Sequence, residues 1–153
     1  MHRDSAPALR FTTVALPPSA IPARLSDALP RGQRAADVVA WIRRGEGLIG
    51  WGTAARFEAK GPTRFEDLAA DWADLLAASK TTDDVQRPGT GPIGFVSFAF
   101  SDTSDAVSVV VVPHTLIGVR DGIWWQTTVE QLAAPDPTMS PPAAPAETPP
   151  SDV

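Results

Sequence analysis

The chain has 153 residues, of which 43% are hydrophobic and 20% are charged, a composition typical of a globular domain. Its net charge is −5 and its longest basic run is Arg43-Arg44, so the composition argues against nucleic-acid binding. Because the chain has no cysteine, disulfides, thiolate metal sites and cysteine nucleophiles are excluded.

The sequence also predicts where the protein works. The first residues carry charge but lack the apolar run of a signal peptide. No apolar stretch reaches the length of about 18 residues that a membrane-spanning helix needs. We therefore expect a cytoplasmic protein that associates with neither membrane nor nucleic acid.

The first third of the chain predicts a strand, an irregular connection and a helix. Leu9–Leu16 is rich in β-forming residues and stops at two prolines, which indicates a strand. Residues 17–34 contain four prolines and predict a wandering connection. Ala36–Arg44 is interpreted as a short helix that Gly45 would end. Its apolar side would hold Val38, Val39, Trp41 and Ile42.

Two short strands and a long helix follow. Leu48–Trp51 and Ala54–Lys60 are interpreted as paired strands, with Phe57 pointing inward. Thr63–Ser79 is predicted to be a helix, because Thr63 and Glu66 have the spacing of a capping box. Apolar residues follow one helical face, namely Phe65, Leu68, Ala69, Trp72, Leu75 and Leu76. The opposite, solvated side would carry Asp67, Asp71 and Asp74.

The second half of the chain reads as strands. After a turn at Pro88–Pro92, the segments Ile93–Phe100 and Val107–Val112 are apolar on both faces. Leu116–Val119 and Ile123–Val129 predict a hairpin about Arg120-Asp121-Gly122, because Asp-Gly is a strong turn signal. Strands that are apolar on both faces need cover on both faces. Either a second domain or partner packs on them, or the sheet folds into a sandwich on itself.

The predicted fold class is α+β, with mostly antiparallel sheet or sheets and two main helices. Residues 1–8 are expected to be a frayed end and residues 9–132 the folded part. Residues 133–153 are rich in proline and alanine and predict a disordered linker or tail.

Two glycine-rich motifs are interpreted as structural. Gly45–Gly50 matches G-x-G-x-x-G, but a helix is expected before it and a strand after it, the reverse of a dinucleotide-binding motif. Its glycines would instead end a helix and lie in a tightly packed strand. Pro88–Pro92 lacks the Gly-Lys-Ser/Thr of a phosphate-binding loop and is interpreted as a turn.

Residues of chemically active type do not form a recognisable constellation. His114 follows a proline at a strand break, without a second ligand at metal-binding spacing, so we interpret it as structural. The others considered are Lys60, Lys80, Asp83, Asp84, Ser97 and Ser101. The lysines are expected to be solvated, the aspartates to lie in a loop, and the serines to lack a base. We predict no catalytic, cofactor-binding or metal-binding residue in this chain.

Three stretches carry a resemblance to a known family. They are Ile42–Gly52, Pro88–Phe100 and Ser108–Pro113, in this order, with the helix at Arg64-Phe65 between the first two. The chain, from about residue 10 to about residue 130, resembles the amino-terminal region of isochorismate synthases of the actinobacterial menaquinone type. These are chorismate-utilising enzymes, and the resemblance implies their fold, shared with anthranilate and aminodeoxychorismate synthases, in which stacked sheets form two similar halves.

The resemblance also implies a reaction. In this family, water adds at C2 of chorismate as the C4 hydroxyl leaves, with a lysine as general base, a glutamate as general acid and Mg²⁺ held by further glutamates. Those positions lie beyond the linker in the family, so no residue here is matched to them. The expected function is that of the amino-terminal segment of this isomerase, in menaquinone or siderophore biosynthesis, truncated before its catalytic part.

Such a segment is expected to be inactive alone, to need Mg²⁺ only in the complete enzyme, and to need a separately encoded catalytic half as its partner. It would then be a frameshifted remnant or one subunit of a split enzyme. The alternative is a stand-alone, non-enzymatic binding or interaction module derived from the same scaffold. A complete small enzyme is the third and weakest interpretation.

Overall fold

The computed structural model describes residues 6–133, which form nine strands in two sheets and one α-helix. The helix α1 spans Arg64–Ala78, and three short 3₁₀ helices lie at Pro18–Ala20, Leu25–Ala28 and Ala35–Asp37. The strands are β1 (Leu9–Ala15), β2 (Val38–Arg43), β3 (Glu46–Trp51), β4 (Ala55–Ala59), β5 (Lys80–Asp83), β6 (Phe95–Ser97), β7 (Ser108–Val112), β8 (Thr115–Arg120) and β9 (Ile123–Gln131).

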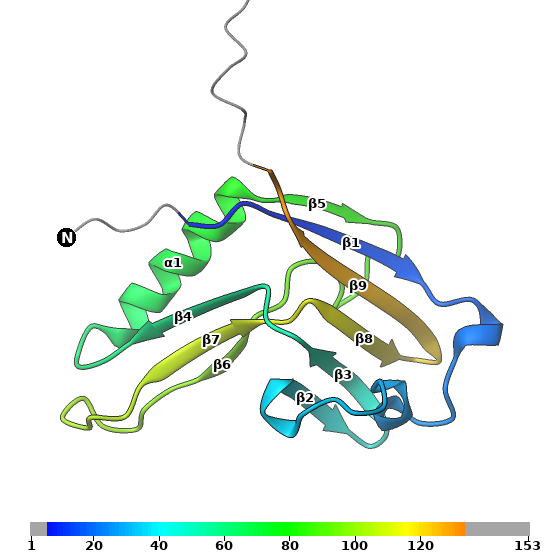
Figure 1. Cartoon of the computed structure of the whole chain (residues 1–153), viewed down its shortest axis with the longest axis horizontal. Coiled ribbons are helices and arrows are strands. Elements are labelled where there is room, and N and C mark those ends of the chain that lie inside the picture. The colour runs from blue at the N-terminus through cyan, green and yellow to red at the C-terminus, as the bar shows by residue number, and fades with distance from the viewer. Residues whose placement is uncertain (1–5, 134–153) are drawn as a thin grey trace, which may run out of the picture.

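The strands form a larger and a smaller sheet (Figure 1). The larger, sheet A, has the order β2-β3-β8-β9-β1-β5, and the smaller, sheet B, has the order β4-β7-β6. The chain passes between the sheets four times: from β3 to β4, from β4 through α1 to β5, from β5 to β6, and from β7 to β8. Every pairing is antiparallel except that of β1 with β5. The predicted class, α+β with mostly antiparallel sheets, is therefore confirmed.

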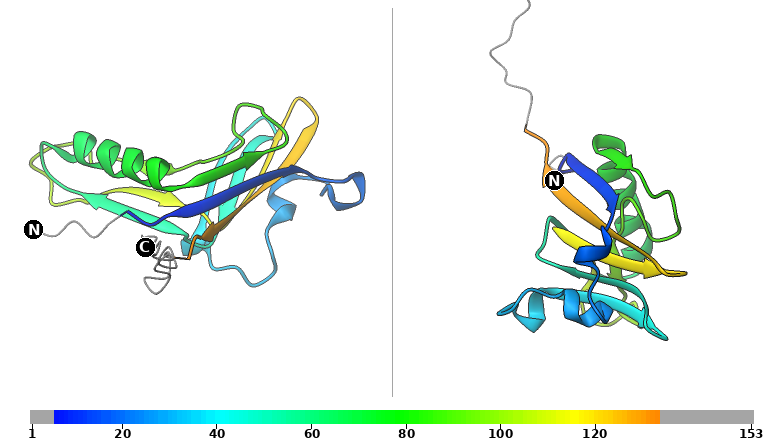
Figure 2. Two further views of the ribbon diagram at one scale, coloured as in Figure 1. Left: turned by 90° about the horizontal axis from the view of Figure 1, so that it is seen from above. Right: turned by 90° about the vertical axis from the view of Figure 1, so that its right-hand side faces the viewer.

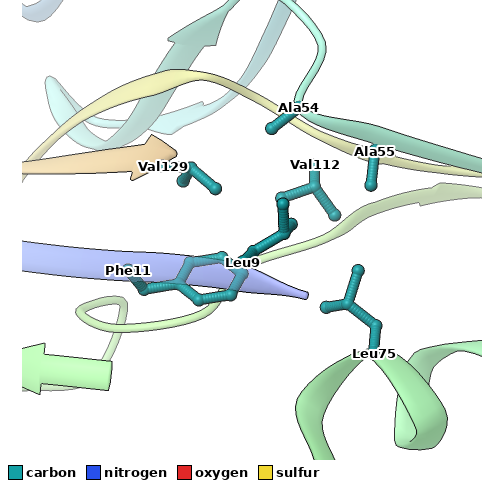
Figure 3. Packing of buried hydrophobic residues seen from close by; sticks show 7 residues of the cluster. All are labelled: Leu9, Phe11, Ala54, Ala55, Leu75, Val112 and Val129. Atoms are coloured by element: carbon teal, nitrogen blue, oxygen red, sulfur yellow. The ribbon is translucent and has the colours of Figure 1, made fainter. Parts of the chain in front are cut away.

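The main core lies where α1 meets the two sheets. The helix lies along sheet B and contacts β4 and β7 (Figure 2). Figure 3 shows the buried side chains of this core, which come from both sheets and from the helix: Leu9, Phe11, Ala54, Ala55, Leu75, Val112 and Val129. A fully buried large apolar side chain contributes about 1.5–3 kcal/mol, so this cluster holds α1 on the sheets.

The prediction of a helix at Ala36–Arg44 is wrong, because residues Val38–Arg43 of this segment form β2. β2 pairs with β3 in an antiparallel hairpin whose turn residues, Arg44 and Gly45, both have positive φ. Such a turn matches the twist of two strands, and β-branched and aromatic residues favour a strand over a helix. An apolar pattern at 38, 39, 41 and 42 fits both structures, so periodicity alone could not separate them.

Two predicted strand assignments are also corrected. The segment predicted as Ala54–Lys60 forms β4, but it pairs with β7 of sheet B and not with β3. Residues 80–83, expected at a helix end and in a loop, form β5, the parallel neighbour of β1. This short polar strand carries no apolar alternation, and its backbone pairing with β1 holds it in the sheet.

The long helix is confirmed as α1, although its capping box does not form. The Thr63 hydroxyl donates to the carboxylate of Asp67 over 2.8 Å, and the Thr63 side chain makes no capping hydrogen bond to the backbone. Leu68 and Leu75 are buried, as the apolar face predicts. Phe65 and Leu76, on the same predicted face, are each exposed by more than a third.

The strand predicted over Ile93–Phe100 is shorter than expected. Of this segment, only Phe95–Ser97 (β6) pairs with β7. Beyond it, the Ala99 N–H donates to the Ser108 side chain and not to a neighbouring strand. Phe98 leaves the sheet and lies against Phe65 of α1, with the two ring centroids 4.5 Å apart. Val96, Phe98 and Phe100 remain exposed, whereas on β7 the valines are buried or half-buried.

The hairpin predicted about Asp121-Gly122 is confirmed: β8 and β9 pair directly, and both turn residues have positive φ. Most of the expected frayed end and linker, residues 1–5 and 134–153, lies outside the described residues. Within residues 6–133, α1 is too short and too polar to cross a membrane.

Candidate functional site

An open apolar groove lies between sheet A and the segment that contains β6. It has a volume of about 900 Å³. Its walls come from β2, β3, the β8–β9 hairpin, the loop before β6, and β6 itself. The lining residues are Ala40, Trp41, Arg43, Glu46, Gly47, Leu48, Pro88, Gly89, Ile93, Gly94, Phe95, Val96, Val119, Arg120, Asp121 and Trp125.

A smaller hollow of about 360 Å³ continues the groove toward α1. The two hollows share Ile93, Gly94 and Val96. The second is lined further by Phe65, Leu68, Ala69, Trp72, Pro92, Phe98 and Val110. Together they form one apolar surface running from β2 to α1, which we call the β6 groove.

Trp125 forms the floor of the β6 groove. Its side chain is 1% exposed, and its indole N–H donates to the carbonyl oxygen of Gly89 over 3.2 Å. Leu48 and Leu116 are buried beside it, and Ile93 and Phe95 pack on this cluster from the β6 side. Glycine is required at 118, since a Cβ there would overlap the indole ring.

Polar groups gather at one end of the groove only. There the carboxylate of Glu46 accepts a hydrogen bond from the backbone N–H of Asp121 over 2.8 Å. Arg120 and Asp121 form an exposed ion pair at 3.9 Å, and Arg43 lines the same end of the groove. These charges are solvated and adjoin two hairpin turns. The rest of the lining is apolar, so away from this charged end the groove offers apolar contacts and no acid–base pair.

A hydrogen-bonded loop supports the groove from the side of β5. The carboxylate of Asp83 accepts hydrogen bonds from the N–H groups of Val85 and Gln86, each over 2.9 Å, and from the hydroxyl of Thr90. Partial burial alone would raise the pKa of Asp83, but these three hydrogen bonds outweigh it and lower the pKa below its ordinary value. Sequence reasoning placed Asp83 in a loop and missed this role; the signal for it is the Asp-to-backbone turn pattern.

The glycine motif Gly45–Gly50 lies in the β2–β3 hairpin, so a strand and a turn precede β3. Gly47 has φ +135°, and a Cβ there would overlap the carbonyl oxygen of Trp41. A Cβ on Gly50 would meet Pro113. The glycines therefore allow close packing, which agrees with the structural interpretation of the motif and not with a nucleotide site.

The remaining candidate residues are not brought together. The imidazole Nδ1 of His114, in the bend between β7 and β8, lies 3.2 Å from the carbonyl oxygen of Val129 on β9. Ser101 shares a hydrogen bond with Thr103 over 2.9 Å, and Ser97 lies on exposed β6. Lys60 and Lys80 are exposed and do not line the β6 groove. Among residues 6–133, no group of three or more His, Asp or Glu side chains is placed to hold a metal ion.

Comparison with known proteins gives one match. A protein-family model described as "Chorismate binding enzyme" matches residues 27–134, more than two thirds of the chain. All residues that line the β6 groove fall inside this range. Searches of curated proteins and of solved structures gave no match.

Proposed function

We propose, given that the chain belongs to the chorismate-binding enzyme family, that it is the amino-terminal scaffold segment of an isochorismate synthase. This proposal rests on the finding that three separate stretches of the sequence lie beside one another in the fold. The three stretches that resemble isochorismate synthases, Ile42–Gly52, Pro88–Phe100 and Ser108–Pro113, each contribute to the lining of the β6 groove. The three stretches thus meet at one surface, although the last contributes only Val110 to it.

This scaffold segment would contribute neither the general base nor the general acid of the reaction. Isochorismate formation moves a hydroxyl group: water adds at C2 of chorismate and the C4 hydroxyl leaves as water, so the product is an isomer. The step needs a base to activate water and an acid to protonate the leaving hydroxyl. Neither lysine lines the groove, and Glu46 at its end is already engaged with the backbone of Asp121.

Mg²⁺ assists this reaction in the family, so its fit to the residues present is relevant. Mg²⁺ prefers several oxygen ligands, mainly carboxylates and water. The described residues offer no cluster of three or more carboxylate or imidazole side chains. They therefore do not fit the ion, and the metal would be held by the catalytic half.

The test is chorismate turnover with Mg²⁺, with isochorismate as the detected product. The chain is assayed alone and after co-expression with the catalytic half of an isochorismate synthase of the type it resembles. We expect turnover only in the co-expressed complex. Turnover by the chain alone would contradict the scaffold role, since it would require a catalytic site on this chain.

A second candidate is a non-enzymatic binding module built on the same scaffold. It is favoured by the shape of the β6 groove, which is large, open and apolar with polar groups at one end, as binding sites often are. The turnover assay separates the two functions. If the co-expressed complex assembles but forms no isochorismate, the enzyme-segment proposal fails and the binding module is favoured.

A further inference from the structure

The strand β2 is the longest open sheet edge in the part of the chain that the structure describes. It has six residues and lies outermost in sheet A, and Figure 1 shows it at the lower border of the molecule. The other outer strands are shorter or covered: β5 has four residues and is polar, β6 has three, and β4 contacts α1. β2 also exposes apolar side chains, with Trp41 73% exposed and Ile42 44% exposed. An edge of this kind is a template for pairing with another strand.

Alternate residues of β2 turn their backbone groups away from sheet A. A two-residue turn follows Arg43, and the pair of residues that flanks such a turn is hydrogen-bonded, so the odd-numbered residues of β2 bond to β3. The residue before the strand continues this pattern, since the Asp37 carbonyl accepts from the Gly52 N–H over 3.1 Å. The N–H and C=O groups of Ala40 and Ile42 therefore point outward, where no strand lies beside them among residues 6–133.

These outward groups can bond to the same groups of a second copy of the chain. An antiparallel strand reaches them only if its own outward residues lie opposite them. That condition is met when Ala40 lies opposite Ala40, on a two-fold axis. The two Ala40 residues then exchange both backbone hydrogen bonds, and the Ile42 N–H of each copy donates to the Val38 carbonyl of the other. The Val38 N–H is already bonded to the Ala35 carbonyl, so the shared ladder ends there.

The side chains that meet in this register match in shape and in charge. Val39 lies opposite Trp41 in a non-hydrogen-bonded pair, where cross-strand side chains are closest. Arg43 lies opposite Asp37 of the other copy, at each end of the paired strands. The Oδ2 atom of Asp37 accepts from Arg34 over 2.8 Å, which leaves the other carboxylate oxygen for a second donor. The charge of Arg43, which shields β2 against other strands, is therefore paired in this register.

Neighbouring registers lose this match. Sliding the second copy by two residues keeps the outward backbone groups opposite each other, but it places Arg43 opposite Val39 or Ala35, neither of which is charged. The complementarity is thus a property of β2 with itself. Because Asp37 and Arg43 lie at opposite ends of one strand, two antiparallel copies bring them together twice.

We infer that two copies of this chain pair through β2, antiparallel about Ala40, into a homodimer in which the two copies of sheet A form one continuous sheet. The partner is a second copy because this edge is complementary to itself in backbone pattern, in apolar side chains and in charge. The inference goes beyond the proposed function and does not rest on it, since neither a substrate nor a catalytic half takes part.

The experiment is sedimentation velocity on the full chain over a range of protein concentrations. Arg43→Asp places two acids opposite each other, and Asp37→Arg places two arginines opposite each other. We expect each variant to raise the Kd of the dimer at least about tenfold, because like charges then face each other. Arg10→Asp is the matched control, because Arg10 is exposed on β1 of the same sheet, away from β2. It should change the Kd less than about twofold.

Mixing the two variants separates strand pairing from a loss of folding. Chains with Arg43→Asp and chains with Asp37→Arg each repel their own copies, but in a mixed dimer both facing pairs have opposite charges. We expect the mixture to form a heterodimer with a Kd close to that of wild type. Positions 37 and 43 lie about 20 Å apart along one strand, so a contact within one chain cannot produce this recovery.

Amide hydrogen exchange, followed by NMR at low and high protein concentration, provides a readout of the backbone pairing itself. The amides of Ala40 and Ile42 should gain protection in the dimer. Those of Val39 and Trp41 should not, because they already bond to β3. Association through the exposed Trp41 side chain alone would not produce this alternation.

Several results would overturn the inference. A wild-type chain that stays monomeric at every concentration would do so, as would a dimer whose Kd is unchanged by Arg43→Asp. A dimer that Val96→Lys dissociates and Arg43→Asp does not would use the β6 groove instead of β2. Failure of the two variants to form a heterodimer, with both shown to be folded by near-UV circular dichroism, would also exclude this pairing.

Discussion

Gly118 and Trp125 are direct partners across the β8–β9 pair, and the indole ring of Trp125 occupies the space that a side chain at position 118 would need. The ring also lies under Gly89, where an added Cβ would come within 3.2 Å of it. Two glycines far apart in the sequence thus make room for one tryptophan. That tryptophan is the floor of the β6 groove.

Substitution of Gly118 should therefore be costly although alanine is small. We expect Gly118→Ala to lower the free energy of unfolding by about 1–3 kcal/mol or more, because overpacking forces the indole or a strand to shift. Urea denaturation measures this change. In the double variant Gly118→Ala/Trp125→Leu the loss should be smaller than the sum of the single losses, since leucine vacates the contested space. Additive losses would contradict the steric explanation.

A buried pair of hydroxyls ties strands β1 and β9 of sheet A to the loop before β6. Thr13 and Thr127 are both almost fully buried, and their side-chain oxygens lie 2.7 Å apart. The Thr13 oxygen also accepts a hydrogen bond from the N–H of Gly91 over 3.1 Å. We expect Thr13→Val to destabilise the fold by about 1–3 kcal/mol, because it leaves Gly91 and Thr127 without this partner.

The measurements for Thr13→Val are urea denaturation and amide exchange. Exchange at Gly91 should rise more than exchange at amides in the β2–β3 hairpin, which does not contact this pair. Thr127→Val should cost less, because it leaves the bond between Thr13 and Gly91 in place. If the two single variants were equally destabilised and Gly91 stayed protected, the hydrogen bond to the loop would have no role in stability.

Much of sheet A and all of α1 could be predicted from sequence, since local signals agree with the tertiary structure there. β1 and the β8–β9 hairpin have strong β-forming residues and an unambiguous turn. The helix has a clear apolar periodicity. In these elements no long-range contact opposes the local preference.

The predictions were wrong for segments whose secondary structure depends on pairing with a distant segment of the chain. The residues of β2 are compatible with a helix, and only pairing with β3 through the Arg44-Gly45 turn makes them a strand. β5 is polar and short, and it exists because β1 supplies a parallel neighbour. The partner of β4 is β7, more than forty residues later in the chain. Sequence periodicity carries no information about such partners.

The β6 groove could not be located from sequence, although one consequence of it was expected. Apolar residues on both faces of Ile93–Phe100 suggested that something further packs there, or that the sheet closes on itself. In the structure, the side chains on both faces of β7 are buried or half-buried, whereas Val96 and Phe98 remain exposed. Which of the two apolar segments is covered depends on the placement of α1 and β4, which the pattern did not specify.

The loss of folding stability at acid pH should depend on the carboxyl group of Asp83. A carboxyl group whose folded pKa is lowered stabilises the fold fully above its unfolded value, near 3.8, and loses that contribution as the pH falls through the folded pKa. We therefore expect wild type to lose more stability than Asp83→Asn on acidification below pH of about 4. Thermal unfolding followed from pH 6 to pH 2.5 measures the difference. Asp84→Asn, which removes the same charge from an exposed neighbour, should retain the acid sensitivity of wild type.

Arg64 anchors the segment after β6 to the start of α1. Its side chain is 5% exposed, and its guanidinium donates to the carbonyl oxygens of Ala99 over 3.1 Å and Gly61 over 2.9 Å. Arg64→Met should cost about 1–3 kcal/mol, because two carbonyl groups lose a charged donor. Limited proteolysis should also cut residues 99–107 faster in this variant.

Arg56 offers the matched control for Arg64. It pairs with Glu58 on β4 over 2.8 Å, with both side chains about half exposed. An exposed ion pair contributes little, about 0–1 kcal/mol, so Arg56→Met should leave stability and the proteolysis pattern nearly unchanged. Equal effects of the two variants would mean that loss of a positive charge, and not loss of the buried anchor, is responsible.

The exposed apolar lining of the β6 groove predicts dye binding by the native chain. We expect the purified protein to bind 8-anilinonaphthalene-1-sulfonate while it keeps near-UV circular dichroism and cooperative unfolding, which separates a native apolar groove from a molten globule. Val96→Lys should reduce the fluorescence, and Val14→Lys should not, because only Val96 lines the groove. A compact, cooperatively folded monomer that binds no dye would show that the groove is closed in solution. The unpaired faces of Val96 and Phe98 would then need no partner.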